Sequence, residues 1–145
     1  FRPKLEDTFE DDSSADVRKQ RAVTILIVRG DIDSPEILAV SRKDDHAAFG
    51  LPGGKVERDE SHVAAARREL REETNVDATI FDPIFKRVDE DFVVTTFFVN
   101  HYYGIPGSRL GEGVVAWVKP EVLTNGPFGQ YNRKLFEAVG IPFED

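Results

Sequence analysis

Residues 54–76 read GKVERDESHVAAARRELREETNV and contain the pattern on which the prediction of the fold rests. A helix over this stretch places Glu69, Glu72 and Glu73 at i, i+3 and i+4, so their carboxylates emerge side by side. Like charges at this spacing destabilise an isolated helix. A divalent cation, which prefers oxygen ligands, would offset the repulsion.

The residues around the three glutamates also favour a helix. Residues 59–61 (DES) predict an N-terminal cap, and Asn75 predicts an end in the left-handed conformation. We expect a narrow apolar stripe that packs against a sheet and consists of Val63, Ala66 and Leu70. The alternative is a solvent-exposed helix in which the glutamates pair with neighbouring arginines.

The sequence before the helix favours a ligand site over the solvent-exposed alternative. Residues 51–54 (LPGG) predict a rigid turn. Paired glycines in such a turn allow a backbone carbonyl to approach a ligand closely.

The whole stretch resembles the Nudix box, whose pattern is G-x5-E-x7-R-E-U-x-E-E-x-G-U, where U is a bulky aliphatic residue. Gly54, Glu60 and residues 68–76 (RELREETNV) match every fixed position except the last glycine, which is Asn75 here. Asparagine is also tolerant of a positive φ. The resemblance covers about a sixth of the chain.

The rest of the chain predicts a single α+β or α/β domain. With 145 residues, it is long enough to bury a core. We expect a polar, acidic N-terminal arm over residues 1–20 and one domain over residues 21–145. Strands are predicted at 21–29, 36–41, 77–88, 91–103 and 113–118, a helical turn at 120–123 and a second amphipathic helix at 130–139. The resemblance implies an α/β/α sandwich, a Nudix fold with a central mixed β-sheet between helices.

Composition excludes several other classes of protein. The net charge of −8 argues against general nucleic-acid binding, and the absence of cysteine excludes disulfides and thiolate metal sites. No apolar run approaches the roughly 20 residues that span a bilayer. We therefore expect a cytoplasmic protein whose partner is a small-molecule nucleotide, with no nucleic acid or membrane partner. The chain starts at Phe1 without a methionine, so the sequence leaves open whether a targeting segment precedes it.

The resemblance also implies a metal-dependent hydrolase of nucleoside diphosphate derivatives that uses Mg2+, with Mn2+ as the other candidate. Glu69 and Glu73 would be the principal ligands. Arg68 would hold the glutamates by a bidentate contact. The full set of implied metal ligands is the carbonyl of Gly53 with Glu60, Glu69, Glu72, Glu73 and Glu112.

The general base and the substrate contacts lie partly outside the box. The base is either a box glutamate or Glu112, which follows a glycine-rich loop and precedes a strand with Trp117, as in MutT-like members. Asn132 resembles the purine-reading asparagine of those members. Lys55 is a candidate phosphate contact, as is Lys43, and the candidate aromatic walls of a base pocket are Phe49, Phe85 and Phe92.

Three functions fit these residues. The first is hydrolysis of a nucleoside triphosphate to the monophosphate and pyrophosphate, with an oxidised nucleotide among the candidates. The second is the same chemistry on a dinucleoside polyphosphate, ADP-ribose or a nucleotide sugar. The third is a non-catalytic nucleotide sensor, against which the intact glutamates count.

Overall fold

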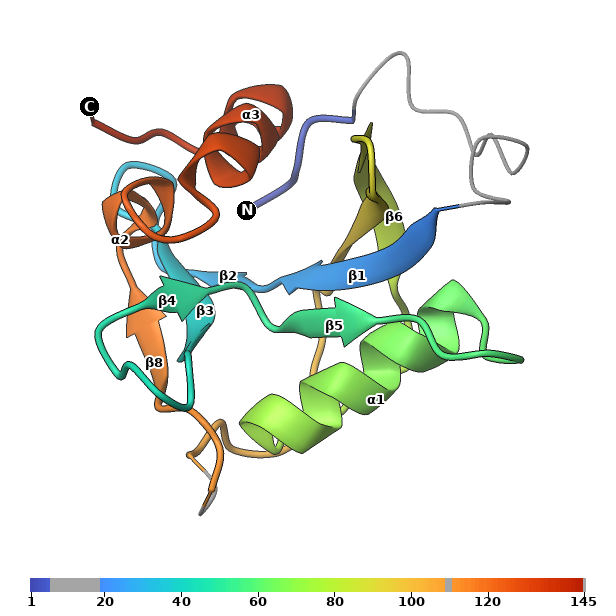
Figure 1. Cartoon of the computed structure of the whole chain (residues 1–145). Helices are drawn as coiled ribbons and strands as arrows, with labels where there is room; N and C mark the ends of the chain where they lie inside the picture. Colours follow the sequence, from blue (N-terminus) through green and yellow to red (C-terminus); the bar gives the residue numbers. More distant parts are fainter. Residues whose placement is uncertain (6–18, 109–110, 145) are drawn as a thin grey trace.

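The computed structural model describes residues 1–5, 19–108 and 111–144, and Figure 1 shows their arrangement. Three helices and eight strands follow one another along these residues. In chain order they are β1 (Gln20–Leu26), β2 (Val28–Arg29), β3 (Glu36–Ser41), β4 (Phe49–Gly50), β5 (Gly53–Lys55), α1 (His62–Thr74), β6 (Asp82–Val88), β7 (Phe92–Phe98), β8 (Val115–Val118), α2 (Pro120–Thr124) and α3 (Gly129–Val139).

The strands form two four-stranded sheets. The first has the order β5-β1-β7-β6, in which β1 pairs with β7 in parallel and the other pairs are antiparallel. In the second, β3 is central: β8 pairs along it, and the short strands β2 and β4 also pair with it. Because β2 follows β1 after a single residue, the chain passes directly from one sheet into the other.

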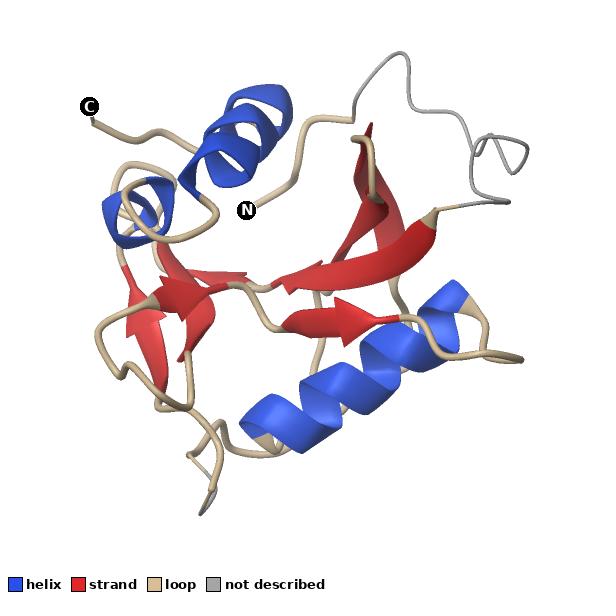
Figure 2. Ribbon diagram, viewed as in Figure 1, coloured by secondary structure: helices blue, strands red, loops and turns tan. Residues whose placement is uncertain are grey.

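Helices lie on both sides of the strands (Figure 2). Helix α1 packs on β1 and β5, while α3 packs on β6 on the opposite side. Side chains alternate along a strand, and neighbouring residues of β7 therefore enter different cores. Phe97 joins the core that includes Leu70 of α1, and Phe98 joins the core that includes Phe136 of α3. The predicted α/β/α sandwich is confirmed, with two sheets in place of the single central sheet.

The sequence located most elements well. The strand Glu36–Ser41 has the predicted bounds, and α2 and α3 differ from their predicted ranges by one residue each. The strands predicted at 77–88 and 91–103 are shorter, since β6 begins at Asp82 and β7 ends at Phe98. An isolated antiparallel bridge joins Asp77 and Tyr103 beyond those ends.

Helix α1 begins and ends as predicted, but its buried face is different. The Ser61 side chain accepts a hydrogen bond from the Ala64 N–H at 3.0 Å, and Asn75 ends the helix with φ of 64°. The prediction that Val63 faces the core is wrong, because its side chain is 44% exposed. The face that packs on β1 and β5 is centred further round the helix and consists of Ala65, Ala66, Leu70 and Thr74.

Gly53 and Gly54, at the start of the box, belong to a strand, which corrects the predicted turn. Strand β5 pairs with β1, where Gly53 lies opposite Thr24. A Cβ atom on Gly53 would lie 2.1 Å from the carbonyl oxygen of Val23. This position therefore requires glycine because β5 packs so tightly on β1.

The predicted N-terminal arm lies mostly outside the described residues. Of the residues that are described, Phe1 contacts the Phe98 ring edge-on, and the Lys4 N–H donates to the Val139 carbonyl at 2.8 Å. Gln20 already belongs to β1. In the part of the chain that the structure describes, no helix is long and apolar enough to cross a bilayer.

Candidate active site

Arg68 organises the acidic face of α1. Its Nε and Nη2 atoms donate to both carboxylate oxygens of Glu60, at 2.8 and 2.9 Å. Its Nη1 atom donates to Glu69 at 2.7 Å, and Nη2 also reaches the Lys55 carbonyl at 3.1 Å. The expected bidentate contact of Arg68 is thus present, and it is made with Glu60. Hydrogen bonds from Arg68 lower the pKa of Glu60 to about 2.

Glu73 lies beneath β5. One of its carboxylate oxygens accepts the Gly53 N–H at 2.8 Å. Burial and the negative charges of Glu69 and Glu112 raise the pKa of Glu73 to about 8, although the Gly53 hydrogen bond acts in the opposite direction. The most buried glutamate of the box is therefore held by strand β5 and surrounded by other carboxylates.

Glu69 fills the space that Gly54 leaves free. A Cβ atom on Gly54 would lie 2.5 Å from a carboxylate oxygen of Glu69. Burial raises the pKa of Glu69 despite its contact with Arg68. The negative charge of Glu69 also raises the pKa of Glu73, so the two carboxylates lie close together. Gly54, the first residue of the box, thus makes room for a carboxylate.

The two remaining predicted acids differ in position. Glu72 is 56% exposed, and its carboxylate lies 3.5 Å from Nη1 of Arg68. Glu112 reaches the site from the loop before β8, and its carboxylate lies 3.2 Å from Nζ of Lys43. The following residue, Gly113, packs closely on Ser41, because a Cβ there would lie 1.9 Å from the Ser41 carbonyl oxygen.

The acidic side chains are suited to a cation, but they are not arranged as a finished metal site. Within residues 1–5, 19–108 and 111–144, no three histidine or carboxylate groups lie close enough together to hold a metal ion. Arg68 and the Gly53 N–H occupy several of the oxygens. However, burial raises the pKa of both Glu69 and Glu73, so the ionised forms of this pair are unfavourable without a compensating charge. A divalent cation could supply that charge, so the donor set fits such an ion.

An apolar pocket of about 390 Å³ lies on the other side of β5. Its volume falls within the range of roughly 300–1,000 Å³ that is typical of small-ligand sites. The pocket combines residues from β1, β5, β7 and α3. It is lined by Ala22, Val23, Thr24, Leu51, Gly53, Gly54, Lys55, Asp89, Phe92, Val94, Phe128, Tyr131 and Asn132. We call this the β5 pocket.

The structure brings some predicted substrate contacts to the β5 pocket and excludes others. Asn132 and Lys55 line it, as does Phe92. Asn132 is 2% exposed, and its side-chain nitrogen donates to the Leu123 carbonyl at 3.2 Å, which fixes the amide. Phe49 is not a lining residue, because β4 directs it toward the core beneath α3, and Phe85 is fully buried.

Two aromatic residues of the pocket were missed from the sequence. Phe128 stands at the rim, 65% exposed, just before α3, and Tyr131 follows in the first turn of that helix. The signal was present in residues 127–131 (PFGQY), next to Asn132. Ligand pockets are lined mainly by apolar and aromatic side chains with a few polar groups, and this segment supplies both kinds.

Comparisons with known proteins identify the family. The family model described as NUDIX domain matches residues 18–139. The chain belongs to the Nudix family. This Nudix protein is 36% identical over 103 residues to a Haemophilus influenzae protein named 8-oxo-dGTP diphosphatase, with 67% of this chain and 74% of the relative covered. It is 25% identical over 120 residues to a Streptomyces ambofaciens protein named MutT-like protein, with 81% and 75% covered.

Solved structures agree with this assignment. The E. coli ORF135 protein has a TM-score of 0.68 with the Nudix chain at 26% identity, with 85% of this chain and 89% of that one covered. A structure from a study of MutT from Aliivibrio salmonicida and Vibrio cholerae has a TM-score of 0.66 at 28% identity, with 82% and 94% covered. The predicted family, the fold and the assignment as a Nudix-type hydrolase are confirmed.

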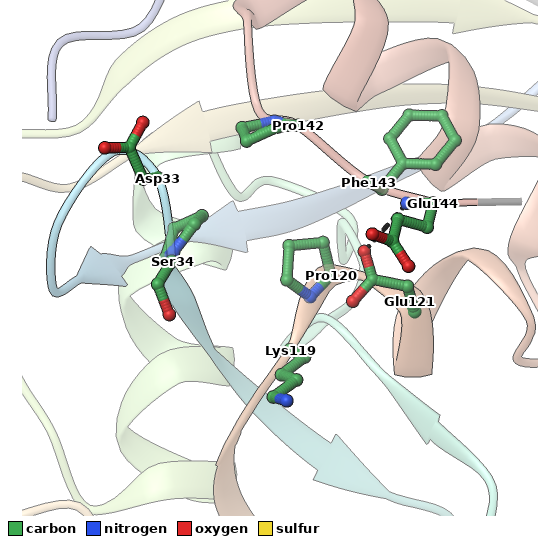
Figure 3. Close-up of a pocket in the computed structure, with 9 residues that line it drawn as sticks. Asp33, Ser34, Lys119, Pro120, Glu121, Pro142, Phe143 and Glu144 are labelled. Atoms are coloured by element: carbon green, nitrogen blue, oxygen red, sulfur yellow. Dashed lines mark hydrogen bonds between the residues drawn. The ribbon is translucent and has the colours of Figure 1, made fainter.

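A second cleft of about 300 Å³ lies away from the Nudix box (Figure 3). It is formed by the loop before β3, the start of α2 and the C-terminal segment, none of which contributes a box residue. Its lining is mainly polar, and Glu121 accepts the Glu144 N–H there at 2.9 Å. The β5 pocket, not this cleft, adjoins the acidic side chains.

Proposed function

We propose that this Nudix hydrolase cleaves a nucleoside triphosphate to the monophosphate and pyrophosphate with the help of Mg2+. Strand β5 is the observation that carries the proposal. Gly53 and Gly54 contact the carboxylates of Glu73 and Glu69, and the same two residues line the apolar pocket. A nucleoside in the pocket would therefore direct its phosphates toward the acidic side chains.

The box residues have distinct roles in this proposal. Glu69, Glu73 and the Gly53 carbonyl would hold Mg2+, or Mn2+, with Glu60, Glu72 and Glu112 around them. The ion would neutralise the phosphates and lower the pKa of a bound water. Arg68 keeps Glu60 and Glu69 in fixed positions, and a fixed position matters because a misplacement of about 1 Å can cost on the order of 100-fold in rate.

Glu112 and the nearby lysines complete the proposed site. The Glu112 carboxylate is close enough to Glu73 to raise the pKa of Glu73, so Glu112 lies near the proposed metal ligands and is our candidate for the group that takes a proton from the attacking water. A box glutamate is the other candidate for this step. Lys43, paired with Glu112, and Lys55, at the rim of the β5 pocket, supply positive charge near the phosphates.

The β5 pocket supports a purine as the base. Phe92 and Phe128 offer aromatic surfaces on which a base can stack, and the fixed amide of Asn132 can read its edge. The relative named 8-oxo-dGTP diphosphatase suggests an oxidised purine as the preferred base. We therefore place 8-oxo-dGTP first among the candidate substrates.

A substrate panel in the presence of Mg2+ tests this proposal. It includes 8-oxo-dGTP, the ordinary triphosphates, a dinucleoside polyphosphate, ADP-ribose and a nucleotide sugar, and it measures pyrophosphate and phosphate separately. We expect one pyrophosphate for each nucleoside monophosphate formed. If a dinucleoside polyphosphate, ADP-ribose or a nucleotide sugar were turned over faster than the triphosphates, that compound class would be the substrate. Binding of nucleotide without turnover would favour a sensor.

A further inference from the structure

A chain of three hydroxyl groups lies at the floor of the β5 pocket. Thr24 Oγ1 lies 2.7 Å from Thr96 Oγ1, which lies 2.5 Å from the Tyr131 hydroxyl oxygen. Thr24 and Tyr131 line the pocket, whereas Thr96 is 0% exposed beneath them. The two threonines are register partners on the parallel strands β1 and β7.

The number of protons limits what this chain can donate. Each of the two hydrogen bonds needs a proton, but the Thr96 hydroxyl carries only one. At least one bond must therefore use the proton of Thr24 or of Tyr131. Whatever else Tyr131 contacts, at most one of the two pocket hydroxyls can donate to a ligand while both bonds persist. The other can still accept.

We propose that this hydroxyl chain selects bases that present one acceptor beside one donor, and disfavours edges with two acceptors. Guanine presents two acceptors, O6 and N7, on one edge. An 8-oxoguanine carries a hydrogen on N7, so the same edge offers one acceptor and one donor. The inference rests on the part of the proposed function that places the base in the β5 pocket, and not on hydrolysis itself.

Thr96 acts in this proposal without touching the ligand. The Thr96 hydroxyl has one proton for two hydrogen bonds, and this limits how many protons Thr24 and Tyr131 can donate to a ligand. Thr96 is therefore a positioning residue. Guanine would have to break one bond of the chain to receive two donors. The loss of one hydrogen bond corresponds to roughly a tenfold change in affinity.

Equilibrium binding of dGMP and 8-oxo-dGMP tests the hydroxyl chain without requiring turnover. We expect the wild-type protein to bind 8-oxo-dGMP at least about tenfold more tightly. Thr96→Val removes both hydrogen bonds of the hydroxyl chain, so neither pocket hydroxyl has to donate to Thr96. We expect dGMP then to bind more tightly and the ratio to fall by about tenfold. Tyr131→Phe removes one end of the chain, so the ratio should fall because 8-oxo-dGMP binds more weakly.

A matched control separates this effect from a change in packing. Thr95→Val makes the same substitution one residue earlier on β7, where the side chain points to the opposite face of the sheet. We expect it to leave the ratio unchanged. If Thr96→Val does not fold, Tyr131→Phe carries the test.

Three results would overturn the hydroxyl-chain proposal: no preference or no binding in the wild-type protein, a ratio unchanged in both variants, or an equal effect of Thr95→Val. Preferential binding of 8-oxo-dGMP without hydrolysis of any triphosphate would contradict the proposed function but would still support the hydroxyl-chain proposal. Hydrolysis of a triphosphate without preferential binding of 8-oxo-dGMP would support the proposed function and overturn the hydroxyl-chain proposal.

Discussion

The Gly53 N–H donates to a carboxylate oxygen of Glu73 across 2.8 Å, and this bond joins strand β5 to helix α1. Gly53 also lines the β5 pocket, so one residue links the acidic cluster to the proposed base site. A shift of β5 would therefore disturb both sites together. The predictions below address the parts of this arrangement one at a time.

The metal-free protein should lose stability as the pH rises from about 4.5 to about 8. The pKa of Glu73 is raised from 4.5 to about 8, so in this range the folded state binds a proton that the unfolded state has released. The free energy of unfolding should fall by at most about 1.4 kcal/mol per pH unit. Urea unfolding with a chelator at several pH values measures this.

Glu73→Gln is the control for the pH effect, because glutamine does not titrate. Its free energy of unfolding should vary less steeply over the same range. Mg2+ should stabilise the wild-type protein most at the upper end of this range, where Glu73 is readily deprotonated. A wild-type profile that rises with pH in the absence of metal would contradict the position assigned to Glu73.

Gly54→Ala should reduce turnover by on the order of 100-fold, because the new methyl group displaces the Glu69 carboxylate. Gly107→Ala is the matched control, since its nearest contact would be an ordinary 3.9 Å. Steady-state kinetics on both variants, with circular dichroism to check the fold, measure the effect. Equal rates in the two variants would mean that the close packing of Glu69 on Gly54 does not matter for turnover.

Much of the fold could be predicted from residues that act locally. Ser61 and Asn75 set the ends of α1, and the β-branched and apolar residues of β3 marked that strand correctly. Strand β5 could not be predicted in the same way, because glycine has a low strand propensity. Its conformation depends on pairing with β1, which is distant in the sequence.

The candidate site also has a part that could be predicted from local sequence and a part that could not. The spacing of Glu69 and Glu73 predicted that they lie together on one helix face, and Glu69 is close enough to raise the pKa of Glu73, whereas Glu72 is exposed. The β5 pocket could not be deduced, because Thr24, Phe92 and Tyr131 come from three separate segments and meet only in the folded chain. Phe49 was a candidate aromatic wall of the base pocket, but the pairing of β4 with β3 turns it toward the core.

Arg68→Lys should lower kcat with little change in the affinity for nucleotide. Lysine retains the positive charge but cannot contact Glu60 through two atoms while it also holds Glu69. We expect a loss of at least about tenfold in kcat. Arg67→Lys serves as the control, because Arg67 pairs with Asp77, which is not a proposed site residue. A similar loss in both variants would point to a general effect on α1.

Phe128→Ala should weaken nucleotide binding without changing the chemical step. Its exposed ring at the rim of the β5 pocket can stack on a base, and such stacking is worth about 1–3 kcal/mol. KM should therefore rise by roughly tenfold or more while kcat stays near the wild-type value. A fall in kcat at unchanged KM would assign Phe128 a role other than base stacking.

The central claim is that the carboxylates on α1 act with Mg2+ to cleave a nucleoside triphosphate, and Glu73→Gln tests it most directly. Glutamine can still accept the Gly53 hydrogen bond, so the fold should persist. Pyrophosphate release from 8-oxo-dGTP should be measured for both proteins in saturating Mg2+. The account predicts stoichiometric pyrophosphate from the wild-type protein and a loss on the order of 1,000-fold or more in the variant. Turnover by the folded variant at a rate near that of the wild-type protein would contradict it.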